Sequence, residues 1–368
     1  MTDGLIKKYK DLRTERFLGE VCTRKYAFVG MGQHSLSNLY PMLDYLKVPL
    51  KYICVTSERK AELISAKFPG VQGVASLETV LSDPEVAGVF VAAAPAAHFG
   101  IASKVLAAGK ALFIEKPPCS SLKELESLAE AAGNGIFEAG LQKRYAPAVR
   151  ILVSRLEHHL PSHYDLHYRT GAYPEGDALM DLFIHPLDMV TAIFGEATML
   201  SCTLPGEKTA GAETLLLTLG HPHGVIGTLE LSTAYSWKTA CESLSVCTGK
   251  GAYRLEGMDE LSFCPLQGKV LGLPVEKVRP RTETVEYLYK RNGFNPVISE
   301  NQVVSAGYFD EIRAFVSAVE ACPAFPAPHQ GRPDARSRAK AHPILSSFDD
   351  IRPTYRLLDK IAVAANDL

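Results

Sequence analysis

The chain has 368 residues, more than a single hydrophobic core usually holds, so we expect two domains of common size. Hydrophobic residues make up 46% of the chain and charged residues 22%, which is typical of a globular protein and excludes a largely disordered one. The formal net charge is only -2, so no overall positive field favours a nucleic acid as partner.

The sequence shows no sign of export or of a membrane. No apolar run reaches the roughly 18 to 20 residues that span a bilayer. Residues 1–25 mix basic and acidic side chains where a secretory signal would have an apolar core, so we interpret them as a short amphipathic lead-in helix. The eight cysteines never form a C-x-x-C pair, and several, such as Cys54, lie in apolar runs. Thiols scattered in this way fit a reducing compartment, and we expect the cytoplasm.

Short apolar runs alternate with helical patterns throughout the first half of the chain. The apolar runs contain few polar residues, as expected when helices cover both faces of a parallel sheet. We expect strands at 26–29, 50–55, 74–75, 86–92, 111–114 and 135–139, and helices at 35–46, 58–68, 77–81, 98–108 and 122–132. This alternation predicts an α/β fold with a doubly wound parallel (Rossmann) sheet, in a dinucleotide-binding domain spanning residues 1–144.

The pattern changes after about Tyr145. We expect helices at 149–159, 308–321 and 351–365, and strands at 164–169, 199–203, 214–219, 225–232, 242–247 and 252–255. The last three or four strands are typical of an antiparallel meander, and residues 323–343 of an exposed loop. We therefore predict that residues 145–368 form an α+β domain with a largely antiparallel open sheet. This domain would bind a small-molecule substrate, and its open face suits assembly into a homodimer or homotetramer.

A glycine-rich turn follows the first predicted strand. Gly30 allows a tight turn, and Gly32 lets the backbone approach a pyrophosphate, whose charge the start of the next helix favours. The third position of the motif holds Ser35, which is small enough for close helix packing. A structural turn is the alternative, but the position between strand and helix favours a dinucleotide.

The end of the second strand distinguishes the two nicotinamide cofactors. An acidic residue there would bond the ribose 2′-hydroxyl and repel a 2′-phosphate. This chain has Thr56 and Ser57 at that place and Arg59 just beyond, which suits a 2′-phosphate. We expect NADP, while Glu58 leaves NAD possible.

Two motifs carry side chains for chemistry. Lys116 follows the fifth strand at the carboxyl edge of the sheet, where ligands bind in such folds, although a surface loop is the alternative. Asp181 and His185 are four residues apart and would share one face of a helix. A histidine oriented by a carboxylate can take a proton from an alcohol, which is typically worth about 10²- to 10⁴-fold in rate. Pro186 belongs in the first turn of a helix, so residues 181–185 would form the turn that enters it.

Taken together, these motifs resemble the Gfo/Idh/MocA family, named after glucose–fructose oxidoreductase and inositol dehydrogenase. The resemblance extends from about Lys25 over nearly the whole chain. It is carried by Gly30-x-Gly32, Val91 to His98, Glu115-Lys116-Pro117, Lys143-Arg144-Tyr145 and Asp181-x-x-x-His185-x-x-Asp188. The chain departs from the family at Ala93 and Ala96, where the family often has polar residues.

The resemblance implies that Lys116, Asp181 and His185 are the catalytic residues. Lys116 would position the substrate oxygen, His185 would exchange its proton, and Asp181 would hold the polar network together. The resemblance also implies that Glu115 and Lys116 lie near the nicotinamide ribose and that Arg144 lies near the cleft. The substrate-binding residues that we expect are Lys116, Arg144, Asp181 and His185. The expected cofactor contacts are Gly30, Gly32, Gln33, His34, Ser35, Thr56, Ser57, Arg59, Ala94, Pro95, His98, Glu115 and Lys116.

Other side chains favour ordinary roles. His159, His163 and His167 would need one continuous helix to share a metal ion, and Pro161 argues against it, so we predict no metal site. Trp237 and Tyr235 either line a sugar pocket or belong to the core, and we favour the core. The basic residues of the loop at 323–343 are interpreted as solvated, with a substrate phosphate as the alternative.

We therefore predict an NAD(P)-dependent oxidoreductase that transfers a hydride to or from a secondary alcohol or ketone carbon of a sugar, polyol or sugar derivative. The alternative is a cofactor-binding sensor or assembly protein without turnover. The presence of Lys116, Asp181 and His185 together favours the enzyme.

Overall fold

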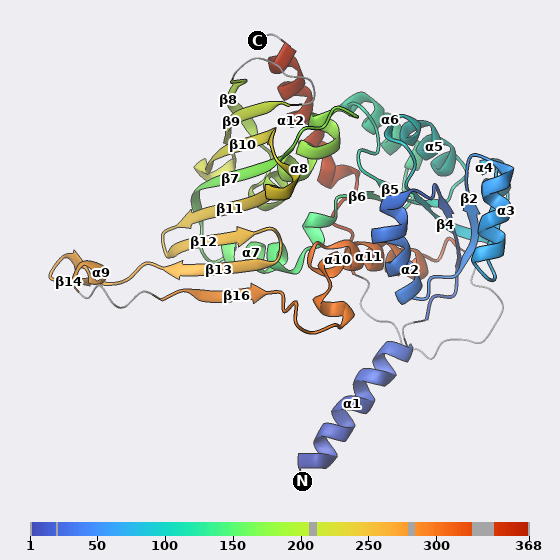
Figure 1. Cartoon of the computed structure of the whole chain (residues 1–368), viewed down its shortest axis with the longest axis horizontal. Coiled ribbons are helices and arrows are strands. Elements are labelled where there is room, and N and C mark those ends of the chain that lie inside the picture. Colours follow the sequence, from blue (N-terminus) through green and yellow to red (C-terminus); the bar gives the residue numbers. More distant parts are fainter. Residues whose placement is uncertain (1, 20, 206–211, 279–283, 326–341, 367–368) are drawn as a thin grey trace. The chain divides into compact units, whose positions relative to one another are not determined.

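The structure is a computed structural model that describes residues 2–19, 21–205, 212–278, 284–325 and 342–366 (Figure 1). The chain forms two compact units. The first contains residues 1–115, 128–138 and 312–344, and the second contains residues 116–127, 139–311 and 345–368. Each unit is therefore built from several stretches of chain, and the division at residue 144 stays a prediction about domain organisation. Most of the predicted loop at 323–343 lies outside the described residues.

The predicted doubly wound sheet is confirmed. Its six strands lie in the order β3-β2-β1-β4-β5-β6, and the pairs β1–β2, β1–β4, β2–β3 and β4–β5 are parallel. The order reverses between β1 and β4, which is the point where open α/β sheets bind ligands. The strands are β1 (Lys25–Val29), β2 (Leu50–Cys54), β3 (Gln72–Val74), β4 (Val86–Val91), β5 (Ala111–Glu115) and β6 (Phe137–Gly140).

The helices of this part of the chain match the predicted ones closely. They are α2 (Tyr40–Tyr45), α3 (Glu58–Lys67), α4 (Leu77–Leu81), α5 (Pro95–Ala107) and α6 (Leu122–Ala132), with a turn of π-helix at Ser35–Leu39 before α2. The lead-in segment is a helix, α1 (Thr2–Gly19), as predicted, but it is not amphipathic, because its apolar residues do not gather on one face, and Leu5, Tyr9 and Leu12 are exposed.

An aromatic cluster forms the core of the first unit. All six residues of β4 are buried, and the Phe90 ring of this strand lies 5.4 Å from the ring of Phe113 on β5. Phe315 from α11 (Tyr308–Ala321) packs edge-on against both rings. Aromatic contacts of this geometry add about 0.5–1.5 kcal/mol each to the burial of the rings. A helix near the end of the chain therefore completes the core of the first unit.

The second unit contains the predicted open sheet. It has eight strands in the order β16-β13-β12-β11-β7-β10-β9-β8. The strands are β7 (Pro161–Gly171), β8 (Thr198–Thr203), β9 (Thr214–Gly220), β10 (Ile226–Tyr235), β11 (Cys241–Thr248), β12 (Gly251–Glu256), β13 (Glu260–Pro265) and β16 (Glu286–Lys290). Of the predicted meander, the antiparallel pairs β9–β10 and β11–β12 are confirmed, and β13, which was not predicted, continues it beyond β12. The prediction was wrong in making β10 and β11 neighbours, because β7 lies between them and is parallel to β10.

Side chains alternate across the central strand β7. Tyr164 and Leu166 are buried on the face that carries the helices, and the Tyr164 ring stacks on Phe194 of α8 at 4.3 Å. Asp165 and His167 point to the other face and remain partly exposed. Three helices pack on the buried face, namely α7 (Pro147–Leu156), α8 (Ile184–Phe194) and α12 (Phe348–Asn366). The small β14–β15 hairpin (Lys269–Val270 and Leu273–Pro274), α9 (Val275–Val278) and β16 escaped prediction. No helix among the described residues is long and apolar enough to cross a membrane.

Candidate functional site

The turn after β1 has the geometry of a phosphate-binding turn. Gly30 adopts φ +94°, and a Cβ atom there would lie 2.2 Å from the carbonyl oxygen of Ala92, so only glycine fits. The Gly30 N–H donates to the carbonyl of Cys54 at 2.9 Å, which fixes the turn against β2. A Cβ atom on Gly32 would meet no other atom within 4 Å, so the backbone is open to a ligand there. The turn therefore fits a pyrophosphate at the helix start.

Of the side chains at this helix start, one is buried and two are exposed. Ser35 is 1% exposed, as its small size predicted, whereas Gln33 and His34 are exposed. His34 Nε2 lies 3.1 Å from Oε1 of Glu115, a buried residue at the end of β5. The sequence did not predict this contact, which joins two of the expected cofactor residues.

A buried histidine contacts the backbone of the loop that follows β4. His98 is 1% exposed, and its Nε2 lies 3.0 Å from the carbonyl oxygen of Ala93. The buried imidazole therefore supports the loop that leads through Ala94 into α5, which begins at Pro95. The cofactor contacts expected for Ala94, Pro95 and His98 stay a prediction.

The end of β2 presents hydroxyl and basic groups to solvent. Ser57 caps α3 and accepts a hydrogen bond from the N–H of Lys60 at 3.4 Å. Thr56, Glu58 and Arg59 are exposed. The Thr56 hydroxyl and the Arg59 guanidinium are therefore accessible to a ligand, and so is the Glu58 carboxylate between them.

In the second unit, Lys116 lies against the segment that carries Asp181. The Lys116 ammonium donates to the backbone carbonyl of Asp181 at 2.5 Å. The Asp181 carboxylate accepts from the Asp177 N–H at 3.1 Å and from the Tyr173 hydroxyl at 3.3 Å. Burial and the negative charge of Asp181 raise the pKa of Tyr173, so this phenol stays protonated at neutral pH. The structure thus brings the predicted Lys116 and Asp181 together and adds Tyr173.

The Asp181 segment is shaped by a helix cap and a glycine. Asp177 Oδ1 accepts from the N–H groups of Leu179 and Met180 at 2.9 and 3.3 Å, which satisfies donors at the helix start. A Cβ atom on Gly176 would lie 2.3 Å from Asp181 Oδ2, so a larger residue would push this carboxylate away. Gly176 and Asp177 have positioning roles that sequence reasoning missed, although they lie only five and four residues before Asp181.

His185 follows a turn of π-helix. Residues Leu179–Phe183 form this turn, and α8 continues it with His185 as second and Pro186 as third residue. The expected turn before Pro186 is therefore a wider helical turn, a feature frequent at functional sites. The His185 side chain is half-buried, and its Nδ1 atom is buried.

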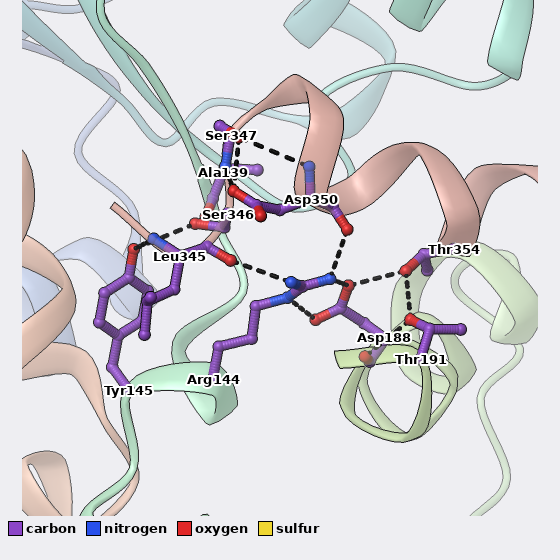
Figure 2. A network of polar contacts seen from close by, with 10 residues as sticks. All are labelled: Ala139, Arg144, Tyr145, Asp188, Thr191, Leu345, Ser346, Ser347, Asp350 and Thr354. Carbon is purple, nitrogen blue, oxygen red and sulfur yellow. Dashed lines mark hydrogen bonds and ion pairs between the residues drawn. The ribbon is translucent and has the colours of Figure 1, made fainter. Parts of the chain in front are cut away.

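Arg144 lies in a buried network and not at a substrate surface (Figure 2). Its Nε and one Nη atom donate to the Asp188 carboxylate at 2.8 and 2.7 Å. The guanidinium also donates to the carbonyls of Leu345 and Asp350 at 2.9 and 2.8 Å. Four of the five N–H groups of an arginine are thus used within the protein. We therefore correct the substrate-binding role expected for Arg144 to a structural one, with Asp188 as its counter-ion.

A second ion pair stands next to Arg144 in sequence. The Lys143 ammonium donates to both oxygens of Glu242 on β11 at 2.6 Å, and both side chains are nearly buried. The ammonium also lies 5.0 Å from the centre of the Tyr168 ring, a cation–π distance. Burial and the charge of Glu242 raise the pKa of Tyr168, so its phenol is neutral. Glu242 and Tyr168 carried no signal in the sequence that marked them as partners of Lys143.

The remaining candidates are the histidines considered for a metal site and the aromatic residues Tyr235 and Trp237. Among the described residues no group of three histidine, cysteine or acidic side chains could hold a metal ion. Helix α7 ends at Leu156 and strand β7 begins at Pro161, so His159 and His163 do not share a helix. The preference for a core position was wrong for Tyr235 and Trp237, which are 48% and 54% exposed.

The chain is similar in sequence and in fold to known oxidoreductases. Residues 24–134 match a model described as an oxidoreductase family with an NAD-binding Rossmann fold, and residues 148–254 match the GFO/IDH/MocA C-terminal domain. An inositol 2-dehydrogenase from Acidothermus cellulolyticus is 26% identical, and the match covers 47% of this chain and 55% of that protein. A trans-1,2-dihydrobenzene-1,2-diol dehydrogenase from Oryctolagus cuniculus is also 26% identical, over 57% of this chain and 67% of its own length.

The chain thus spans between about half and two thirds of these curated relatives. Among solved structures, a dehydrogenase from Chromobacterium violaceum superposes with a TM-score of 0.74 at 17% identity, covering 94% of this chain and 96% of that one. At this identity the structural likeness concerns the fold alone.

Proposed function

The chain belongs to the Gfo/Idh/MocA oxidoreductase family, and we propose that it transfers a hydride between a nicotinamide dinucleotide and a secondary alcohol or ketone carbon of a sugar-like substrate. The observation that carries this proposal is the pairing of two features. The first unit has a glycine turn that only glycine can form, and the second has the Lys116 ammonium bonded to the Asp181 segment. A fold for binding alone would not need the second feature.

The first unit fits a dinucleotide. The open backbone at Gly32 and the helix start after it suit a pyrophosphate, and Glu115 with His34 lies at the carboxyl edge of the same sheet. When bound, the nicotinamide supplies the carbon that gives or accepts the hydride.

The second unit supplies the groups that act on the substrate oxygen. We assign to Lys116 the positioning of that oxygen, because an ammonium stabilises the negative charge that develops when an alcohol loses its proton. His185 exchanges the proton, since an imidazole titrates near neutral pH and its buried Nδ1 leaves Nε2 for this task. Asp181, held by Asp177 and Tyr173, orients the site through its carbonyl bond to Lys116.

We further propose that NADP is preferred over NAD. The hydroxyl groups of Thr56 and Ser57 and the exposed Arg59 guanidinium follow the end of β2, where an acidic residue would favour NAD, and such donors support a dianionic 2′-phosphate. The exposed Glu58 is the group that would favour NAD. A fluorescence titration measures the choice, and equal affinities for NADPH and NADH would contradict it.

For the substrate, we propose a cyclic polyol, sugar or vicinal diol. This agrees with the names of the two relatives, an inositol dehydrogenase and a dihydrodiol dehydrogenase. We also propose a homodimer or homotetramer that forms through the helix-free face of the second sheet. Partly exposed polar side chains such as Asp165 and His167 share that face with the exposed Leu216 and Ile226. Light scattering on the purified chain tests the assembly, and a monomer at micromolar concentration would contradict it.

A turnover assay tests the function. We expect the wild-type protein to oxidise or reduce at least one member of a panel of inositols, sugars and diols and their ketones. Lys116→Ala and His185→Asn should lose about 10²- to 10⁴-fold in rate while still binding cofactor. Cofactor binding without turnover across the whole panel would instead support the sensor or assembly protein. Unchanged turnover in both variants would contradict the assigned mechanism.

A further inference from the structure

Two neighbouring residues of α12 contact the two segments that carry Lys116 and His185. The Tyr355 hydroxyl donates a hydrogen bond to the carbonyl oxygen of Cys119 at 2.8 Å. The hydroxyl oxygen of Tyr355 accepts one from the Cys119 N–H at 3.4 Å. Cys119 is three residues after Lys116. One phenol thus holds both backbone groups of a residue in the loop that carries the lysine.

Thr354, the residue before Tyr355, contacts α8, the helix that carries His185. The Thr354 hydroxyl donates to Asp188 Oδ1 at 2.8 Å and lies 2.8 Å from the Thr191 hydroxyl (Figure 2). Thr191 in turn donates to the backbone carbonyl of Asp188 at 2.9 Å. Asp188 is three residues after His185, almost one helical turn further along α8. All of these segments belong to the second unit.

The residues that make these hydrogen bonds are buried. Thr354 and Tyr355 are both 0% exposed, and Cys119 is 3% exposed, so water is not available to replace a lost hydrogen bond. Burial and the nearby Cys119 keep the pKa of Tyr355 well above its usual value, so the phenol retains its proton and can donate. Each contact therefore holds its backbone segment in one place.

The loop after Lys116 depends on this contact more than an ordinary loop would. Pro117 and Pro118 have no N–H groups, so the first backbone donor after the lysine is that of Cys119. That donor is the one bound by Tyr355. The tip of the Lys116 side chain is held separately by the Asp181 carbonyl, which precedes His185 on the same helical run.

We propose that Thr354 and Tyr355 are positioning residues that set the spacing between the Lys116 ammonium and the His185 imidazole. The proposal rests on the proposed function, because it assigns these two groups to one reaction. Neither residue touches the substrate; each acts through the backbone segment or carboxylate that it holds. The chain thus uses one turn of its last helix to align two groups that are 69 residues apart in sequence.

The main test is Tyr355→Phe, which removes one oxygen and keeps the ring. A displacement of about 1 Å in a reacting group can cost on the order of 10²-fold in rate, so we expect kcat to fall by about 10- to 100-fold. KM and cofactor affinity should change less than threefold. Thr354→Val should act in the same direction, and Thr354→Ser, which keeps the hydroxyl, should restore most of the rate. A normal kcat in Tyr355→Phe and Thr354→Val would overturn the proposal.

Tyr164→Phe is the matched control. Tyr164 is also a buried phenol of the second unit, but its hydroxyl bonds the His221 imidazole at 2.8 Å, and its ring, which stacks on Phe194 of α8, is kept in the variant. We expect it to lower thermal stability with kcat unchanged. If Tyr355→Phe merely lowers stability in the same way, its role is structural and the proposal fails.

Hydrogen exchange provides a readout that needs no substrate. In the holoenzyme with NADPH, Tyr355→Phe should speed the exchange of amides in residues 119–122, and Thr354→Val should speed exchange around Asp188. Faster exchange confined to α12 would overturn the proposal. Failure of the wild-type protein to turn over any substrate, with this exchange pattern intact, would instead refute the proposed function.

Discussion

The buried pair Arg144–Asp188 allows a quantitative prediction. Both charges are almost fully inside the protein, with side-chain exposures of 7% and 2%. Burial disfavours the charge on Arg144, but the attraction of Asp188 outweighs it and raises the pKa of the guanidinium. The guanidinium therefore keeps its charge, and removal of one partner leaves the other as an isolated buried group.

We choose Asp188→Asn, which keeps the shape of the side chain and removes its charge. Breaking a buried ion pair in this way typically costs about 3–5 kcal/mol. That is a large part of the roughly 5–15 kcal/mol that stabilises a protein. Arg144→Met should cost a similar amount, because it also leaves the carbonyls of Leu345 and Asp350 without their donor. The double variant should lose clearly less than the sum of the two, since no charge remains unpaired.

Urea unfolding measures these losses. The chain has one tryptophan, Trp237, and it lies in the second unit with the ion pair, so its fluorescence reports the unfolding of that unit. Arg254→Gln is the control, because Arg254 forms an exposed pair with Glu256 and such pairs contribute little. Losses below about 1 kcal/mol for both single variants would refute the reasoning, because the pair would then be effectively solvated.

Two further predictions concern a glycine and a histidine. Gly30→Ala should abolish NADPH binding in a fluorescence titration, because the new Cβ would lie 2.2 Å from the Ala92 carbonyl oxygen; unchanged affinity would show that the turn adapts. Burial, opposed by a hydrogen bond to Gly195, lowers the pKa of His221 from 6.5, so the unfolded chain gains this proton first as the pH falls. The contribution of His221 to stability is therefore complete above pH 6.5 and is lost below it, and His221→Asn should flatten this part of the curve of unfolding free energy against pH. The same slope in both proteins would contradict that assignment.

The sequence predicted the parallel sheet well because its signals are local. Apolar runs such as Val86–Val91 are buried on both faces, and a strand of this kind is recognisable without its neighbours. Pairing in the second sheet is different. Strand β10 lies between β9 and β7, and the pattern of Ile226–Tyr235 contains no information about a partner more than 50 residues earlier. Neighbours in sequence were therefore a poor guide to neighbours in that sheet.

The same limit explains which site residues were missed. Lys116, Asp181 and His185 stand in short motifs with recognisable spacing. Tyr355 is 236 residues from Cys119, and nothing in the intervening sequence indicates that they meet. Arg144 shows the converse error, since its motif was identified but its role was not. A buried counter-ion on α8 decides that role, and burial of a charged residue is a property of the fold.

Transfer of deuterium tests the central claim most directly. The protein is incubated with NADPH deuterated at C4 of the nicotinamide and with a mixed panel of inosose, sugar and diol-derived ketones, and the products are examined by mass spectrometry. We predict that at least one alcohol product gains one deuterium at the reduced carbon, and that Lys116→Ala and His185→Asn form it at least about 10²-fold more slowly. An absence of labelled alcohol from a protein that binds NADPH, or equal labelling in the variants, would contradict the account.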